Sequence, residues 1–295
     1  MTASGDRRRM VAAYVAAVVV VFALAAAAAA VYVGAQSGRD ERADASRALA
    51  FAAKAAAGRL ASSIAANRLG VERLAASPQI SRAIANPAVC TLLFPAAGKA
   101  DRGHFDILRP DGTVLCSSRK GRLPGYQHAS WLPRIRKAPQ FLAPVLDRAT
   151  SDQVALSAIP VRGGIVTGFY DLTAAGPYLA SLYNGGLRLE FLVTSQDSRT
   201  VVARSLAPRR WVGKSIERTP FMRDAGRFER RGIDGTRRYY RQVTLEGTGW
   251  HLLAGRDKDD VLAAGRHLEH RLLLILLVGL ATVVASAVLT YRRLA

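Results

Sequence analysis

The sequence predicts an α+β protein in which two small antiparallel-sheet modules follow a long N-terminal helix and lie between two transmembrane helices. Three observations predict this organisation. An uncharged apolar run lies near each end of the chain, an alanine-rich stretch with helical periodicity follows the first run, and a strand-turn-strand pattern then occurs twice. The expected segments are a cytoplasmic N-terminus (1–9), a first transmembrane helix (10–33), a long stalk helix (34–78), a membrane-distal module (79–184), a membrane-proximal module (185–258), a second stalk helix (259–271), a second transmembrane helix (272–291) and a cytoplasmic tail (292–295).

The two apolar runs have the length that a membrane requires. Residues 10–33 and 272–291 contain no charged side chain, and 20 helical residues span a hydrocarbon core of about 30 Å. Arginines precede the first run and follow the second, so the bias of basic residues toward the cytoplasm places both termini inside and the middle of the chain outside. A cleaved signal peptide is the alternative for the first run, because small residues follow it in "YVGAQSG".

The formal net charge of +20 and the pI near 11.0 indicate contact with anionic lipid head groups or with an anionic ligand. An arginine-rich surface that serves only solubility explains the same numbers. Basic pairs next to aromatic residues, as in "RRW" and "RRYY", have the texture of a nucleic-acid surface. The external location argues against a nucleic-acid partner.

The stalk segment contains a stripe of small and apolar side chains at alternating spacings of three and four, which is typical of one helix face. The stripe consists of Leu49, Ala53, Ala56, Leu60, Ile64, Asn67, Val71 and Leu74. It predicts a helix from 38 to about 76. The stripe packs either on the chain's own domain or against a second copy, in a homodimer through the stalk helix. The two arrangements are not exclusive.

Each module is expected to run strand-turn-strand, excursion, strand-turn-strand. The Asp111-Gly112 and Asp234-Gly235 pairs are hairpin signals, and a Gly-Gly pair at 163–164 marks another turn. Residues 128–141, "HASWLPRIRKAPQF", are expected to form a helix or loop excursion in the first module. This pattern is that of a five-stranded antiparallel sheet with flanking helices.

Five strings in this order resemble the double Cache sensor domain, the external part of bacterial chemoreceptors, sensor histidine kinases and diguanylate cyclases. They are "FDILRPDGTVLCSS", "ALSAIPV", "GFYDLTAAGPYL", "WVGKSI" and "GWHLLAGRDKDDVL". The likeness covers about residues 36–271. It implies two PAS-like modules, a small ligand in the membrane-distal one and relay through the membrane-proximal one.

The resemblance also implies a pocket. Family members that hold amino acids use an Arg-x-Trp-aromatic string for the carboxylate and an Asp before the following helix for the amino group. In "HASWLP", Trp131 fits, whereas Ala129 and Leu132 replace the Arg and the aromatic; Asp171 fits the Asp. The missing guanidinium argues against a free amino acid as the ligand. The expected ligand-binding residues are His104, Tyr126, His128, Trp131, Arg134, Tyr170 and Asp171.

Cys90 and Cys116 both lie in the external segment, where oxidising conditions favour a disulfide over a thiol or a zinc site. "CSS" at Cys116 also resembles the periplasmic CSS-motif region of certain cyclic-di-GMP phosphodiesterases, where the disulfide state sets the output. The pair is therefore either a structural staple or a redox switch.

Motifs for enzymatic chemistry are absent from the sequence: there is no Gly-x-Ser-x-Gly, no phosphate-binding Gly-rich loop and no His-Glu-x-x-His. We therefore expect no enzyme activity and no cofactor. His267 and His270, three residues apart, are the nearest approach to a metal pattern, but two ligands rarely make a site.

These features together predict a two-span sensor of the bacterial inner membrane. It would bind a small ligand outside and signal through the second transmembrane helix to a cytoplasmic module in the same chain or in a partner. Two alternatives stay open, a redox sensor acting through Cys90 and Cys116 and a two-span envelope scaffold that binds another protein.

Overall fold

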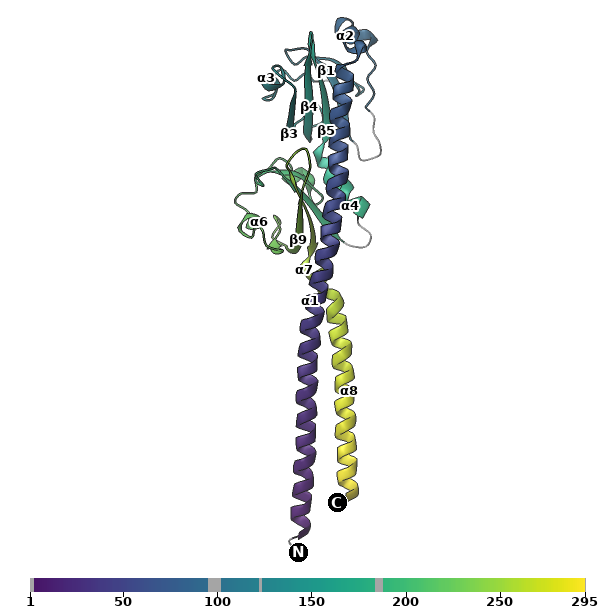
Figure 1. Cartoon of the computed structure of the whole chain (residues 1–295), viewed down its shortest axis with the longest axis vertical. Coiled ribbons are helices and arrows are strands. Elements are labelled where there is room, and N and C mark those ends of the chain that lie inside the picture. Colours follow the sequence, from purple (N-terminus) through teal and green to yellow (C-terminus); the bar gives the residue numbers. More distant parts are fainter. Residues whose placement is uncertain (1–2, 95–101, 122–123, 184–187, 295) are drawn as a thin grey trace. The chain divides into compact units, whose positions relative to one another are not determined.

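The computed structural model of the 295-residue chain describes residues 3–94, 102–121, 124–183 and 188–294 (Figure 1). The chain divides into two compact units. One unit combines residues 1–45 with 258–295, and the other contains residues 46–257. The predicted boundary between the two modules, at 184–185, lies outside the described residues.

The first unit is helical. It contains the beginning of α1 (Ala3–Ala75), followed at the other end of the chain by α7 (Lys258–Val261) and α8 (Ala263–Leu294). Among the described residues, one helix is long and apolar enough to cross a membrane. It is α1, in which the candidate span begins at Ala16 and the most apolar window has a mean hydropathy of 2.6. α8 carries a shorter apolar stretch, Leu274–Ser286, so the second span and the two-span topology stay predictions.

The second unit begins with the rest of α1, and the stripe predicted for this helix is buried. Ala53, Ala56 and Val71 are fully enclosed, and Leu49, Leu60, Ile64 and Asn67 are nearly so. Leu74 packs at the edge of the same core. The helix was therefore predicted correctly, and its apolar face packs on the chain's own domain. A dimer through α1 would have to use another face.

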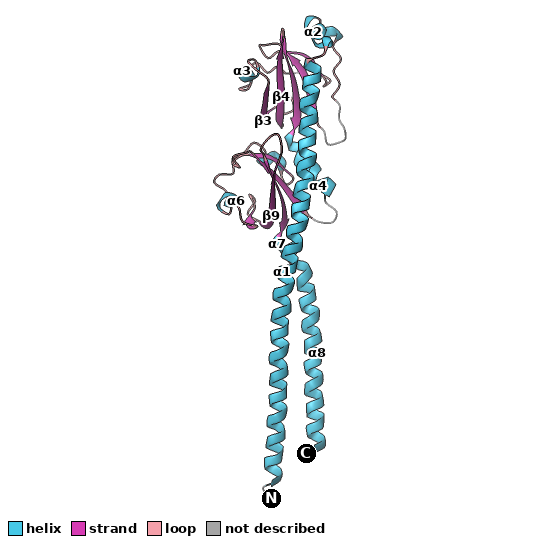
Figure 2. Cartoon of the chain, in the orientation of Figure 1, coloured by secondary structure: helices cyan, strands magenta, loops and turns pink. Residues whose placement is uncertain are grey.

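The first module, called distal after the predicted topology, is a five-stranded antiparallel sheet, whose strands are drawn in magenta in Figure 2. Its strands, in spatial order, are β2 (Val114–Ser117), β1 (Gly103–Leu108), β5 (Gly164–Asp171), β4 (Gln153–Val161) and β3 (Gln140–Leu146). The short helices of the module are α2 (Pro78–Ala85), η1 (Pro87–Val89) and α3 (Leu132–Ile135). A longer helix, α4 (Leu172–Tyr183), follows β5.

The expected excursion 128–141 is interrupted by a strand that sequence patterning missed. β3 begins at Gln140 and pairs with β4, for example Phe141 with Ser157. Pro139 and Pro144 flank and interrupt it, and proline normally argues against a strand because it cannot donate to the ladder. β3 lies at the edge of the sheet, where a missing donor on the open side costs nothing.

The second module, called proximal after the predicted topology, repeats this strand order. Its strand order is β7 (Val201–Arg204), β6 (Leu189–Thr194), β10 (His251–Asp257), β9 (Arg237–Thr244) and β8 (Glu229–Arg231). Its short helices are α5 (Pro208–Trp211) and α6 (Pro220–Arg223). In both sheets the central strand in space, β5 or β10, is the last strand of the module in sequence. This closing strand is therefore hydrogen-bonded to a neighbour on both sides.

α1 packs closely on one face of the distal sheet, and a glycine permits the approach. A Cβ atom at Gly168 in β5 would overlap the Cγ2 atom of Val71, so no larger residue fits without displacing the helix. Val71, Phe105 and Val166 share one apolar core on this face. The opposite face of the sheet is left for a different set of contacts.

Candidate functional site

The side chains of β1 alternate between the two faces of the distal sheet. Phe105 and Ile107 point to the core that contains Val71 of α1, whereas Leu108 belongs to the core on the opposite face. His104 and Asp106 share the face of Leu108, because side chains two residues apart in a strand point the same way. Two polar side chains therefore lie inside the sheet face that α3 and its flanking loops cover.

An aromatic cluster closes this face. The ring of Phe169 in β5 stacks on His104 at 4.4 Å and on Tyr126 at 5.4 Å, and Trp131 lies 5.3 Å from Tyr126. Tyr126 and Trp131 come from the excursion between β2 and β3, which is held by Leu132 and Ile135 of α3 in the same core. The rings form an apolar wall around the polar groups of β1.

A buried acidic cluster lies against this wall. Asp106 and Asp147 are both 0% exposed, and His104 is 2% exposed. The Tyr126 hydroxyl lies 3.0 Å from Oδ2 of Asp106 and 3.1 Å from Oδ1 of Asp147. Nε2 of His104 is 3.4 Å from the same hydroxyl and 3.4 Å from Oδ2 of Asp106. Asp147 also accepts from the Thr150 hydroxyl at 2.6 Å and from the Ala149 amide at 2.9 Å.

The donors of the cluster do not reach every acceptor. A phenol carries one proton, so Tyr126 can donate to Asp106 or to Asp147 but not to both. Oδ1 of Asp106 is buried and has no hydrogen-bond partner in the part of the chain that the structure describes. Burial, followed by the charges of Asp106 and Asp147, raises the pKa of Tyr126 well above its usual range, so the phenol keeps its proton. A ligand that brings donors would complete the cluster.

Arg119 supplies a guanidinium at the edge of the cluster. Its Nη2 atom lies 3.7 Å from Oδ2 of Asp106 and 3.5 Å from the Tyr126 hydroxyl. Its Nε atom is buried, and none of the described residues is a hydrogen-bond partner for it. The site therefore combines two carboxylates with a cation that retains unused donors.

The structure brings three of the seven predicted ligand-binding residues together, namely His104, Tyr126 and Trp131. Strand alternation places Tyr170 on the opposite sheet face, next to Gly168 and α1. His128 and Arg134 are exposed. The binding roles of all seven residues stay predictions.

Asp171, the residue predicted to hold an amino group, caps a helix. Its Oδ1 atom accepts from the amides of Thr173 and Ala174, at 2.8 and 3.1 Å, at the beginning of α4. Burial raises its pKa, and the two backbone hydrogen bonds oppose that shift. Asp171 also lines a cleft of about 730 Å³ that extends to α5.

Sequence reasoning missed Asp106, Arg119 and Asp147. Asp106 had a usable signal, since it is a charged residue at an inward position of the apolar strand "HFDIL", two places after His104. Arg119 and Asp147 lie in connecting segments, and nothing in the local sequence indicates that they meet β1.

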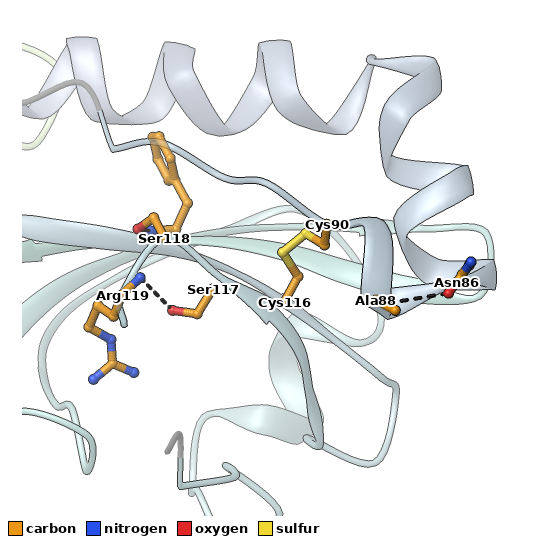
Figure 3. Close-up of a disulfide and its surroundings, with 8 residues drawn as sticks. Asn86, Ala88, Cys90, Cys116, Ser117, Ser118 and Arg119 are labelled. Carbon is orange, nitrogen blue, oxygen red and sulfur yellow. Dashed lines mark hydrogen bonds between the residues drawn. A yellow bond between two sulfur atoms is a disulfide. The ribbon is translucent and has the colours of Figure 1, made fainter. Parts of the chain in front are cut away.

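The predicted disulfide joins Cys90 and Cys116, with 6.0 Å between their Cα atoms (Figure 3). Cys90 follows η1, and Cys116 lies in β2, beside the segment that leads to Arg119. The bond ties the helical entry of the distal module to its sheet. A switching role for it stays a hypothesis.

No group of three or more potential metal ligands occurs among the side chains that the structure describes. His267 and His270 lie outside the described side chains.

Comparison with solved structures shows what this architecture resembles. The ligand-binding domain of the Pseudomonas aeruginosa amino acid chemoreceptor PctB, in complex with L-Arg, matches with a TM-score of 0.55 at 19% identity, over 77% of this chain and 94% of that one. The ligand-binding domain of the Pseudomonas fluorescens chemoreceptor CtaA, in complex with L-serine, matches with a TM-score of 0.54 at 19% identity, over 74% and 99%. The chain has the fold of a double Cache sensor domain.

A third solved structure with this fold is not a chemoreceptor domain. The extracellular domain of rpHK1S-Z16, a protein assigned as a histidine kinase, matches with a TM-score of 0.54 at 13% identity, over 75% of this chain and 97% of that one. No protein-family model matches the chain, and no curated protein matches it. At these identities the likeness establishes the fold, and the ligand has to be argued from the residues of this chain.

Proposed function

We propose that this protein is a membrane-anchored extracytoplasmic sensor whose membrane-distal module binds a small molecule that carries an amine. The fold of its neighbours supports a sensor role, because two of them are ligand-binding domains of chemoreceptors and the third is the extracellular domain of a protein assigned as a histidine kinase. The apolar beginning of α1 supports anchoring in a membrane.

The observation that carries the choice of ligand is the donor shortage around Tyr126. Two buried carboxylates accept from one phenol, and Oδ1 of Asp106 has no hydrogen-bond partner among the described residues. An ammonium group has three N–H donors and a positive charge, so it would supply the donor that Oδ1 lacks and would offset the charge of the two carboxylates. The ring faces of Trp131 and Tyr126 add a favourable surface for a cation.

Free amino acids belong among the ligands to be tested. Ala129 lacks the guanidinium that the family motif places there, but Arg119 brings one to the same cluster. The comparisons give no support to excluding amino acids, since PctB and CtaA were solved with L-Arg and L-serine. In our proposal Arg119 contacts a carboxylate when the ligand has one.

The order of the elements in the chain offers a route by which the ligand signal would reach the second transmembrane helix. β5 and β10 are the closing strands of the two modules, and β10 continues directly into α7 and α8. Ligand binding can shift this pathway only through its different affinity for two states of the distal module. The output is expected in a cytoplasmic module of the same chain or of a partner.

The test is a calorimetric and thermal-unfolding screen of the full-length chain in neutral nanodiscs against amines, amino acids, organic acids and sugars. We expect saturable binding by amine-bearing compounds only. Asp106→Asn should weaken binding about 10- to 100-fold, because it removes a charged hydrogen-bond acceptor. Arg119→Gln should weaken the binding of amino acids but leave the binding of simple amines unchanged.

Asp111→Asn is the matched control, because Asp111 is an exposed aspartate that accepts only within its own turn, from Thr113. It should bind like the wild type. Saturable binding by sugars or organic acids without amines would contradict the proposal, as would amine binding that Asp106→Asn leaves intact. Failure of every compound, together with a stoichiometric protein partner recovered by crosslinking, would favour the scaffold alternative.

Topology has its own test. Protease added to intact spheroplasts should cleave the segment 46–257 and spare the termini. Protection of that segment with cleavage of the termini would overturn the extracytoplasmic assignment.

A further inference from the structure

The membrane-proximal module contains a cleft with an unusual charge. The cleft has a volume of about 620 Å³ and lies between α6 and the hairpin of β8 and β9. Its lining residues are Pro220, Arg223, Asp224, Arg227, Glu229, Arg230, Arg231 and Arg237. Five arginines and two acids give the lining a formal charge of +3.

The acids of the cleft do little to neutralise it. Arg227 lies 4.0 Å from Asp224, and Arg237 lies 3.8 Å from Glu229; both arginines are mostly exposed. Ion pairs of this length at the protein surface have a small interaction free energy. The remaining positive charge is therefore available to a ligand.

Arg230 is the decisive residue of the cleft. It is 6% exposed, and among the described residues its buried Nε atom has no hydrogen-bond partner. Asp224, in the lining of the same cleft, is the acid whose charge acts on this guanidinium. The guanidinium lies over the rings of Phe221, at 4.4 Å, and Tyr240, at 5.1 Å, which hold it in place without neutralising its charge.

The two other buried arginines of the module show that Arg230 is exceptional. Nε of Arg204 lies 2.6 Å from Glu190, and Nη1 of Arg238 lies 2.7 Å from Asp234. Burying a charge is costly unless a partner of opposite charge compensates. Arg230 is buried to the same degree, and the cleft is the place from which a counter-charge can reach it.

The position of Arg230 in the fold is also informative. It pairs with Arg238 across the β8–β9 ladder, as Val145 pairs with Val154 across β3 and β4. Val145 and Val154 face the core beside the distal acidic cluster. Arg230 therefore belongs to the sheet face that, in the distal module, carries the candidate ligand site.

We propose that this cleft is a second ligand site, which binds a small multivalent oxyanion carrying carboxylate or phosphate groups. Arg230 makes the deep contact, and Arg223, Arg231 and Arg237 hold the remaining oxygens at the mouth. The site is independent of the amine site in the distal module.

The test uses the full-length chain in nanodiscs of neutral lipid, titrated calorimetrically with citrate and with inorganic phosphate. We expect saturable binding of at least one of them. Arg230→Met, which keeps an apolar chain between the two rings, should weaken binding at least tenfold. Arg218→Met is the control, because Arg218 is an exposed arginine of the same module outside the cleft, and it should bind like the wild type.

Two additions keep the test decisive. If Arg230→Met fails to fold, the double variant Arg231→Gln with Arg237→Gln removes charge only at the exposed mouth and should still weaken binding severalfold. Nanodiscs that contain phosphatidylglycerol distinguish a free anion from a lipid head group. If this lipid weakens citrate binding to the wild type, and Arg230→Met abolishes that competition, the bound oxyanion is a lipid head group. No saturable binding in either lipid, or binding that all these variants leave unchanged, would overturn the proposal.

Discussion

The two modules share one topology but treat buried charge in opposite ways. His104 in β1 of the distal module and Glu190 in β6 of the proximal module occupy equivalent positions. His104 pairs with Phe169 of the central strand β5, and Glu190 pairs with Gly255 of the central strand β10. Around Glu190 every acceptor has a donor, from Arg204 at 2.6 Å, Arg238 at 3.1 Å and the Tyr240 hydroxyl at 2.6 Å. Around Asp106, Oδ1 has no donor among the residues that the structure describes.

This difference separates a structural network from a candidate binding site. A buried polar network that is fully satisfied fixes the packing of its strands, whereas one that lacks donors is incomplete without a further group. The modules are also fastened differently: the distal one has the Cys90–Cys116 disulfide, and the proximal one has its ion pairs. Each of the following changes tests one side of this comparison.

The largest effect is expected from Arg204→Met in the proximal module. Arg204 is 1% exposed and bonds to both Glu190 and Asp234, so its removal leaves buried acceptors uncompensated. We expect a loss of about 3–5 kcal/mol in the free energy of unfolding, measured by denaturant titration of the full-length chain in detergent. Arg119→Met in the distal module should cost less than about 1 kcal/mol, because Arg119 is partly exposed and its pair is long. Equal losses for the two variants would refute the comparison.

Removal of the disulfide should have a slightly smaller effect, confined to the distal module. The bond closes a loop with a sequence separation of 26, and the chain-entropy model assigns about 3.5 kcal/mol to such a loop. Cys90→Ser with Cys116→Ser should increase hydrogen exchange in β1 and β2 while leaving β6 and β10 protected. Loss of protection in both modules to the same degree would show that they unfold as one.

Asp106→Asn should leave the stability of the ligand-free chain unchanged or raise it by about 1 kcal/mol, because it removes one of two buried like charges. Glu190→Gln is the matched change in the proximal module, and it should destabilise, because three donors lose a charged acceptor. Thermal unfolding of the two variants side by side measures the contrast. Destabilisation by both would mean that the distal cluster is also structural.

The smallest effect concerns acid stability. Burial alone would raise the pKa of Asp234, but the hydrogen bond and charge of Arg238 outweigh it and bring the pKa to about 2. Because the folded pKa lies below the unfolded value, this carboxylate stabilises the fold above pH 4, and the contribution disappears as the pH falls from about 4 to 2. Asp234→Asn should flatten the acid limb of stability in this interval by about 1 kcal/mol or less, given the partial exposure of the side chain. An unchanged acid limb would contradict this assignment.

Local patterns predicted most of this architecture. The spacing of the stripe from Leu49 to Leu74 identified the buried face of α1, and the Asp-Gly pairs located two hairpins. β3 was missed because its prolines oppose a strand, and only its edge position makes them acceptable. The candidate site depends on contacts between distant segments: Asp106, Arg119, Tyr126 and Asp147 come from four places in the chain, and no local pattern relates them.

The shared phenol has a mechanical consequence. The Tyr126 hydroxyl has two acceptors at nearly equal distance, so it can exchange between them by rotation of the O–H bond alone, with the ring held by its neighbours. One acceptor belongs to the hairpin strand β1, and the other to the segment just after the edge strand β3. In the proposed binding mode, a donor that occupied one carboxylate would leave the hydroxyl to the other. Occupancy would then decide which of the two chain segments Tyr126 tethers.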